Sequence, residues 1–567
     1  MTAFHRTLIA AALTSLVGSA FAGITCQPVA PGEIFISPTT NPGKISPTDG
    51  TCFVNGLKLS THDGVKLTAN VFLPKITSSG QTFPTIIMVN SWVMPDWEYI
   101  GQAQRLAKDG YIVYEYASRG WWQAEGVTQV ASPDDVKDVS DAMDWLIANT
   151  PAKSDAVAVS GISYGSGIAL LALAREPRLK TAVALSTWAN LEDEFYGAET
   201  ANKSNMNLLV DVAPVAGNLD PAVPKLRDDL LNPDTPQSRI DEIRAWSKVR
   251  SPLQELAALN TRKAPVFIGK NYSDEMFNPN NIIKFFAQLQ GPKKLLLNNG
   301  WHAVPELPGA LLGSDNYIYD QAHRWFDYWL KGSANGIVSE PQVDMEVQNS
   351  SGREKLATWP DATVKSFTYN IAPRGDLRFD VSCWCAKGAA GNLQSASSSV
   401  TATDSVSSLF DTVASTGIPV ASELLTGFGL STTASMPLVL RDNGVVYNGP
   451  TLGSALKIRG MAQLQLNVRP TKSQGQVLAY LYDVDDLGIG TLISHGARSV
   501  HTATAGQTIS YPIDMHMAAY TVPAGHHLSL VLDTQDAHYA PASNSTFGMD
   551  VMFSSSLLSS LTIPYIN

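Results

Sequence analysis

One pentapeptide of this 567-residue chain has the residue types of a nucleophilic hydrolase, Gly161-Ile162-Ser163-Tyr164-Gly165. Before it, residues 156–160 form a short apolar run with the length of a strand buried on both faces. After it, residues 167–175 are rich in Ala and Leu, which is typical of a buried helix. The glycines allow the sharp strand-to-helix turn that exposes a nucleophilic serine. Ser163 could instead only cap the helix, but the strand before it and the helix after it favour a nucleophile.

A serine hydroxyl needs a general base, and the base needs a carboxylate to orient it. In α/β-hydrolases the acid and then the histidine follow the serine along the chain. Asp274 and His302 come in this order, and each lies in a loop after a predicted strand. Taken alone, each could be an ordinary loop or packing residue, and Glu275 is a rival for the acid. Their order and their strand-end positions together predict a Ser163–His302–Asp274 triad.

The elements that would position these residues alternate between strand and helix as far as residue 331, which predicts a mostly parallel sheet with helices on both faces. An Asp63-Gly64 turn between two alternating runs predicts a hairpin at its start. The predicted strand 84–89 ends in Asn90-Ser91-Trp92, at the edge where catalytic groups collect in such sheets. Residues 188–251 contain no clear buried strand, so we expect them to form a helical cap over the sheet.

Beyond Gly332 the helical pattern disappears, and short strand-like runs from Val343–Val347 to His527–Leu532 alternate with turn residues. This pattern predicts a β-sandwich or jelly roll. Residues 386–416 are rich in Ser, Thr and Ala, and we expect them to form a long surface loop. The expected organisation is an α/β-hydrolase domain over residues 23–335, with its cap at about 188–251, and a jelly-roll domain over 336–567.

The amino end predicts export. A positively charged start, an apolar run over residues 8–17 and Ala20-Phe21-Ala22 are typical of a signal peptide that is cleaved after Ala22. The mature protein would be secreted or periplasmic, where cysteines oxidise. The chain has four cysteines, which allow three connectivities, and we favour Cys26 with Cys52. No histidine stands near the cysteines at ligand spacing, so no metal and no cofactor are predicted.

The net charge of −11 argues against a nucleic-acid partner, and no basic run contradicts this. No stretch after residue 22 is long and apolar enough to span a membrane. The expected partner is a small ester, amide or short peptide substrate.

Five motifs together resemble the X-Pro dipeptidyl-peptidase-like hydrolases, also called the CocE/NonD type. They are Thr61-His62-Asp63-Gly64-Val65, Arg119-Gly120, the Ser163 pentapeptide, Tyr272-Ser273-Asp274 and Gly300-Trp301-His302. The resemblance covers nearly all of the mature chain and implies an α/β-hydrolase followed by a jelly roll. It also implies Ser163 as nucleophile, His302 as base, Asp274 as the orienting acid and the backbone N–H of Tyr164 as an oxyanion donor.

Two departures from these relatives concern specificity. Their second oxyanion donor is typically a tyrosine hydroxyl in the loop where this chain has Trp92, so the donor here is the Trp92 indole N–H or a backbone N–H. Relatives that hydrolyse α-amino acid esters place further carboxylates just after the catalytic Asp to bind an ammonium group. Here Met276 and Phe277 follow Asp274-Glu275, which argues against that specificity.

Three functions are compatible with these patterns. The leading one is a secreted serine hydrolase that cleaves ester or amide bonds through an acyl-enzyme. The second is an X-Pro dipeptidyl aminopeptidase, which would need an anionic pocket for the free amine of its substrate. The third is a non-catalytic scaffold whose jelly roll binds a glycan or a partner, and the intact Ser, Asp and His argue against it.

Overall fold

The computed structural model describes residues 51–567 except 376–377, 381–384, 388–389 and 427–429. The predicted signal peptide and Cys26 lie outside these residues, so export, cleavage after Ala22 and the Cys26–Cys52 pair stay predictions. Cys52 is buried at the start of the first strand. Among the described residues, no helix is both long and apolar enough to cross a bilayer.

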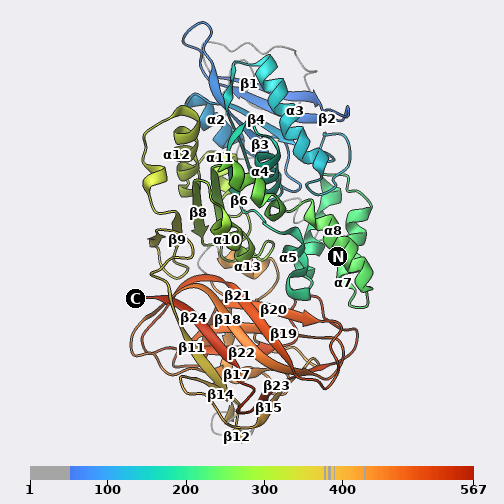
Figure 1. The fold of residues 1–567 in the computed structure, drawn as a ribbon, viewed down its shortest axis with the longest axis vertical. Helices are drawn as coiled ribbons and strands as arrows, with labels where there is room; N and C mark the ends of the chain where they lie inside the picture. The colour runs from blue at the N-terminus through green and yellow to red at the C-terminus, as the bar shows by residue number, and fades with distance from the viewer. Residues whose placement is uncertain (1–50, 376–377, 381–384, 388–389, 427–429) are drawn as a thin grey trace.

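A ten-stranded sheet forms the upper part of the molecule in Figure 1, in the order β1-β2-β4-β3-β5-β6-β7-β8-β9-β10. Neighbouring strands are parallel from β4 to β9, whereas β1, β2 and β10 pair antiparallel. The predicted Asp63-Gly64 hairpin joins the first two strands. The ten strands are β1 (Cys52–Ser60), β2 (Lys66–Leu73), β3 (Phe83–Val89), β4 (Ile112–Ala117), β5 (Ala152–Ile162), β6 (Leu179–Leu185), β7 (Val266–Asn271), β8 (Lys293–Asn298), β9 (Val343–Glu346) and β10 (Arg353–Leu356).

Helices cover both faces of this sheet, and two separate apolar cores lie beneath them. One core includes side chains of α3 (Pro133–Asn149), α4 (Tyr164–Arg175), α9 (Leu256–Arg262) and α10 (Pro279–Gln288). The other includes side chains of α2 (Ile100–Lys108), α11 (Leu307–Leu312) and α12 (Tyr317–Lys331). A capping box between Ser132 and Asp135, with Pro133 in the first turn, fixes the start of α3.

Four α-helices lie within residues 188–251, the segment expected to form a cap. They are α5 (Leu191–Tyr196), α6 (Lys203–Val212), α7 (Ala222–Leu231) and α8 (Gln237–Lys248). Figure 1 shows α5, α7 and α8 together on one flank, beside the end of the sheet that faces the lower domain.

The lower domain in Figure 1 is a β-sandwich built on one continuous twelve-stranded sheet that folds around an apolar core. The domain also contains the two-stranded pair β12–β13 and the short helix α13 (Ala421–Thr426). Its strands are β11 (Lys365–Ala372), β12 (Arg378–Asp380), β13 (Cys385–Lys387), β14 (Ala390–Gln394), β15 (Ala402–Ser407), β16 (Thr433–Ser435), β17 (Val445–Asn448), β18 (Leu456–Pro470), β19 (Gly475–Val484), β20 (Ile489–Val500), β21 (Ile509–Val522), β22 (His527–Asp533), β23 (Gly548–Phe553) and β24 (Ser560–Ile566).

Two details differ from the sequence-based expectation. The strand expected at Val343–Val347 is β9, but it pairs with β8 and so extends the first sheet beyond residue 335. The expected loop over 386–416 was wrong, because it contains the strands β14 and β15. Polar β15 pairs with β23 and buries Asp404 and Val406 on one face, while the hydroxyl side chains of Thr403 and Ser405 lie on the exposed face.

The two domains meet where β20 and β21 lie against the hydrolase domain, below α5 and α10 in Figure 1. Asn280 of α10 binds the backbone of β21. Its Nδ2 donates to the carbonyl of Met515 at 2.9 Å, and its Oδ1 accepts from the N–H of Met517 at 2.7 Å. This interface is close to the loop that carries Asp274, so the β domain supports one side of the candidate active site.

Candidate active site

Ser163 lies at the turn from β5 into α4, with φ 52° and ψ −120°. A non-glycine residue rarely has such a positive φ, and this strain is typical of a nucleophile elbow. Both flanking glycines are required by close backbone contacts. A Cβ on Gly161 would lie 2.4 Å from the carbonyl carbon of Gly165, and a Cβ on Gly165 would lie 2.0 Å from the carbonyl oxygen of Val89. The two glycines therefore allow the close backbone contacts that position the serine.

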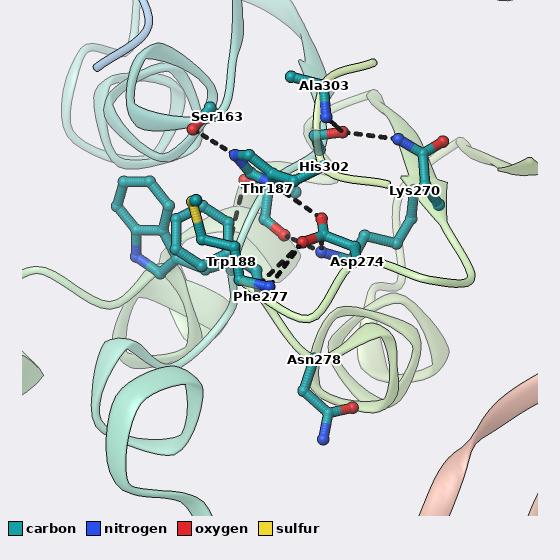
Figure 2. A network of polar contacts seen from close by, with 12 residues as sticks. Ser163, Thr187, Trp188, Lys270, Asp274, Phe277, Asn278, His302 and Ala303 are labelled. Atoms are coloured by element: carbon teal, nitrogen blue, oxygen red, sulfur yellow. Dashed lines mark hydrogen bonds and ion pairs between the residues drawn. The ribbon is translucent and has the colours of Figure 1, made fainter. Parts of the chain in front are cut away.

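The structure brings the three predicted triad residues together from three strand ends (Figure 2). Ser163 Oγ lies 2.6 Å from His302 Nε2, and His302 Nδ1 lies 2.9 Å from Asp274 Oδ2. All three side chains are buried. The Phe277 ring packs edge-on against the imidazole, with 4.8 Å between the ring centroids. This arrangement can pass a proton from Ser163 to His302 while Asp274 holds the imidazole in place.

Asp274 also accepts hydrogen bonds from groups other than His302. Its Oδ1 accepts from the backbone N–H groups of Met276 and Phe277 at 3.1 and 3.0 Å. Its Oδ2 also accepts from the ammonium group of Lys270 at 2.6 Å, and Lys270 is fully buried (Figure 2). Burial raises the pKa of Asp274, but the charges of His302 and Lys270 outweigh burial and lower it overall. The carboxylate is therefore held in its charged form.

Glu275, the rival acid, points away from the triad. Its Oε2 lies 3.3 Å from His495 Nε2 and 3.6 Å from His516 Nδ1, both in the β domain. The two adjacent carboxylates therefore point in different directions, Asp274 toward His302 and Glu275 toward the domain interface.

A buried polar network supports the loop that follows His302. Ser186 Oγ accepts from the N–H of Ala303 at 3.1 Å and donates to Glu306 at 2.9 Å. Asn271 also donates to Glu306. Burial raises the pKa of Glu306 to about 7, although these hydrogen bonds favour its charged form. This network fixes the backbone next to His302.

The predicted oxyanion residues flank Ser163. Tyr164 begins α4, so its N–H has no acceptor within the helix. Trp92 lies close to Tyr164, with 5.3 Å between the ring centroids, but its indole N–H donates to the carbonyl of Leu209 in the cap at 2.9 Å. The backbone N–H of Ser91 donates to Glu98 at 2.6 Å. The backbone N–H of Trp92 has no acceptor among the described residues.

An apolar cavity of about 90 Å³ lies beside Ser163 and Tyr164. Every cap helix lines it, with Leu191 of α5, Leu209 of α6, Leu226 of α7 and Ile243 of α8. Trp92, Trp188 and Phe277 complete the apolar wall. Its charged lining consists of Glu192, Arg227 and Arg244, and Glu192 is already paired with Arg244 at 2.7 Å.

The sheet, the elbow and the Ser–His–Asp geometry define a serine hydrolase of the α/β-hydrolase class. Residues 63–304 match the family model for X-Pro dipeptidyl-peptidase (S15 family), and residues 335–557 match the model for the X-Pro dipeptidyl-peptidase C-terminal non-catalytic domain. The chain belongs to this S15 family of serine hydrolases.

The names and folds of similar proteins are consistent with this family. A Bacillus anthracis protein, provisionally named a Xaa-Pro dipeptidyl-peptidase, is 22% identical over 76% of this chain and 70% of its own length. Among solved structures, an aminopeptidase from a marine sediment Thaumarchaeota archaeon has a TM-score of 0.68 at 14% identity, covering 94% of this chain and 99% of its own. An α-amino acid ester hydrolase has a TM-score of 0.65 at 16% identity, covering 95% and 100%. At such identities the structural likeness shows the fold alone.

Sequence reasoning missed Lys270 and the bond from Trp92 to the cap. Lys270 lies four residues before Asp274 at the end of a buried strand, and a lysine at such a position was the available signal. Nothing in the sequence indicated that Leu209, 117 residues from Trp92, would accept its indole N–H.

Proposed function

We propose that this chain cleaves esters or amides of apolar acyl groups through an acyl-enzyme on Ser163. The observation that carries the proposal is the hydrogen-bonded chain from Ser163 through His302 to Asp274, which opens onto an apolar cavity. His302 takes the proton of Ser163 as Oγ attacks the carbonyl carbon, and then gives a proton to the leaving group. Water, activated by the same histidine, releases the acyl group.

The oxyanion of each tetrahedral intermediate needs two donors near Ser163 Oγ. We assign one to the backbone N–H of Tyr164 and the other to the backbone N–H of Trp92. The alternative donor, the indole N–H of Trp92, would first have to leave the carbonyl of Leu209. This assignment gives Trp92 a second role as a wall of the acyl pocket.

A second candidate is an X-Pro dipeptidyl aminopeptidase, which the family model and the names of relatives favour. Such an enzyme must bind the free ammonium group of its substrate. The one carboxylate that lines the apolar cavity, Glu192, is paired with Arg244, and the remaining charged group there, Arg227, is paired with Asp228 at 2.7 Å. An ammonium group would find no unpaired carboxylate there, so we favour a neutral acyl group.

Matched substrates separate the two candidates. Ala-Pro-nitroanilide and its N-acetyl derivative share a leaving group and differ only in the free amine. Our proposal expects no loss of kcat/KM on acetylation, together with hydrolysis of nitrophenyl esters whose short acyl chains fit the 90 Å³ cavity. A kcat/KM that falls at least about 100-fold on acetylation, the loss expected when a buried charged group is left unpaired, would instead identify the aminopeptidase.

We also propose that the protein is exported and that its mature chain begins at Gly23. Amino-terminal sequencing of the protein recovered from the periplasm or the culture medium tests this. A mature chain that still contained residues 1–22 would contradict it.

A further inference from the structure

A buried cluster of three ligand-type side chains joins the two domains beside the triad. Glu275 follows Asp274 directly and points into the β domain, toward His495 of β20 and His516 of β21. Its Oε2 lies 3.3 Å from His495 Nε2 and 3.6 Å from His516 Nδ1, and the two imidazole centroids are 4.3 Å apart. The three residues come from distant parts of the chain, so only the folded molecule assembles them.

Two atoms of this cluster are buried without hydrogen bonds. The side chain of Glu275 is 10% exposed and that of His516 is 9% exposed. Among the described residues, neither Glu275 Oε2 nor His516 Nδ1 has a hydrogen-bond partner. Buried polar atoms normally have one, so two such atoms directed at the same point indicate a ligand between them.

The spacing fits a transition-metal ion. One ligand atom from each residue lies within 4.8 Å of the other two. Two ligands of a tetrahedral Zn²⁺ ion, bonded at about 2.0–2.1 Å, lie about 3.4 Å apart, close to both distances from Glu275 Oε2. Imidazole nitrogens and a carboxylate oxygen are ligands that Zn²⁺ commonly takes. We propose that Glu275, His495 and His516 bind a divalent transition-metal ion.

The surroundings allow an ion to enter. A polar cavity of about 300 Å³ is lined by Glu275 and His516, and a smaller one of about 70 Å³ is lined by all three ligands. Either cavity can supply a water molecule as fourth ligand. His538 Nε2, 3.9 Å from Glu275 Oε2, is a protein alternative. Binding requires His495 Nε2 to give up its 2.9 Å hydrogen bond with the hydroxyl of Tyr539.

A second cluster has similar spacing but the wrong charge for a cation. His62, Asp138 and Asp141 also place ligand atoms close together. Asp138, however, accepts two hydrogen bonds of 2.7 Å from the guanidinium group of Arg119, which neutralises it. We expect no ion there, and His62→Gln therefore provides a matched control.

The direct test is zinc binding by the full chain after treatment with a chelator. Isothermal titration with ZnCl₂ should give one site per chain, and titration with Co²⁺ should give the visible absorption of a tetrahedral complex. His516→Gln and Glu275→Gln should each weaken zinc binding by more than the 10- to 100-fold that is typical of losing an outer-shell partner. His62→Gln should bind like the wild type, and circular dichroism checks that each variant is folded.

The folded wild type decides the matter even if a variant fails to fold. Zinc-edge absorption of the loaded protein should show nitrogen and oxygen neighbours at about 2.0–2.1 Å, including imidazoles. A wild type that takes up no zinc would overturn the proposal. So would binding that survives unchanged in folded His516→Gln and Glu275→Gln, or that is lost in His62→Gln.

Discussion

Trp92 contacts both the nucleophile loop and the cap, and its indole N–H is already bonded to Leu209. If the backbone supplies the oxyanion donor, Trp92→Phe should keep kcat within a few-fold of the wild type and change KM and acyl-chain preference. Measuring kcat and KM on a short-chain and a longer-chain ester checks this.

Trp188→Phe is the matched control, because Trp188 lines the same cavity and its indole N–H donates to the carbonyl of Arg250 at 2.9 Å. A fall in kcat of about 10²–10³-fold in Trp92→Phe alone, at unchanged KM, would show that the indole is an oxyanion donor.

Lys270 shares Asp274 Oδ2 with His302, so its charge opposes the stabilisation that Asp274 gives to a protonated imidazole. Lys270→Met removes this opposing charge. The acidic limb of the kcat/KM profile should then move to higher pH. Lys270→Arg keeps the charge and should restore much of the original profile. An acidic limb that stays in place or moves to lower pH in folded Lys270→Met would show that Lys270 is only structural.

At the scale of elements, the loop after β3 depends on buried Glu98. Burial raises the pKa of Glu98 to about 8, despite hydrogen bonds from Ser91. Ser91 Oγ lies 2.5 Å from Glu98 Oε1 and 3.1 Å from the carbonyl of Ile162. The hydroxyl has one proton, so when it donates to Ile162 the bond to Glu98 needs a proton from the acid. The geometry therefore agrees with a protonated Glu98.

This raised pKa predicts a pH dependence of stability. The folded state binds the proton of Glu98 more tightly than the unfolded state does, whose pKa is near the ordinary 4.5. Its contribution to stability is complete below about pH 4.5 and is lost as the pH rises toward 8. Glu98→Gln keeps the hydrogen bonds and cannot ionise. Between pH 5 and 7 the wild type should lose about 3 kcal/mol more of its unfolding free energy than the variant. Equal losses in chemical unfolding at the two pH values would contradict this account.

The elbow shows which local structure a sequence can predict. A strand, two glycines and a helix lie within twenty-one residues, from 156 to 176, so their interactions are local and the pattern indicates them directly. The strand β15 was missed because the contacts that form it are not local. Its residues favour a loop when read alone, and its partner β23 lies more than 140 residues away.

At the scale of the molecule, an ion pair between a buried arginine and a half-buried glutamate joins the domains. Arg459 of β18 is 1% exposed, donates to both carboxylate oxygens of Glu354 in β10, and also donates to the carbonyl of Tyr520. Arg459→Met leaves these acceptors without their donor and should cost about 2–4 kcal/mol in unfolding free energy.

Arg469, on the same strand, is the control for this prediction. It binds Asp550 at 2.9 Å and its side chain is 38% exposed, so Arg469→Met should cost no more than about 1 kcal/mol. If calorimetry showed that Arg459→Met and Arg469→Met lower the unfolding free energy equally, the Arg459 pair would add nothing to the interface.

Long-range contacts set the limit of prediction at this scale. The order of strands and helices was enough to expect a hydrolase domain followed by a β domain. The pairing of β9 with β8 joins segments that are distant in the chain, and the approach of His495 and His516 to Glu275 depends on how the domains dock. No local pattern encodes either contact. Lys270, by contrast, was missed despite a local signal, since it lies only four residues before Asp274 at the end of a buried strand.

The central claim is that Ser163 is the nucleophile, and covalent labelling tests it most directly. A fluorophosphonate probe reacts with an activated serine, and mass spectrometry of the digested protein locates the modified residue. We expect one label per chain, on Ser163, and none in a folded Ser163→Ala variant, whose residual rate over water should be about 10³–10⁴-fold. Stoichiometric labelling that persists in Ser163→Ala would contradict the account.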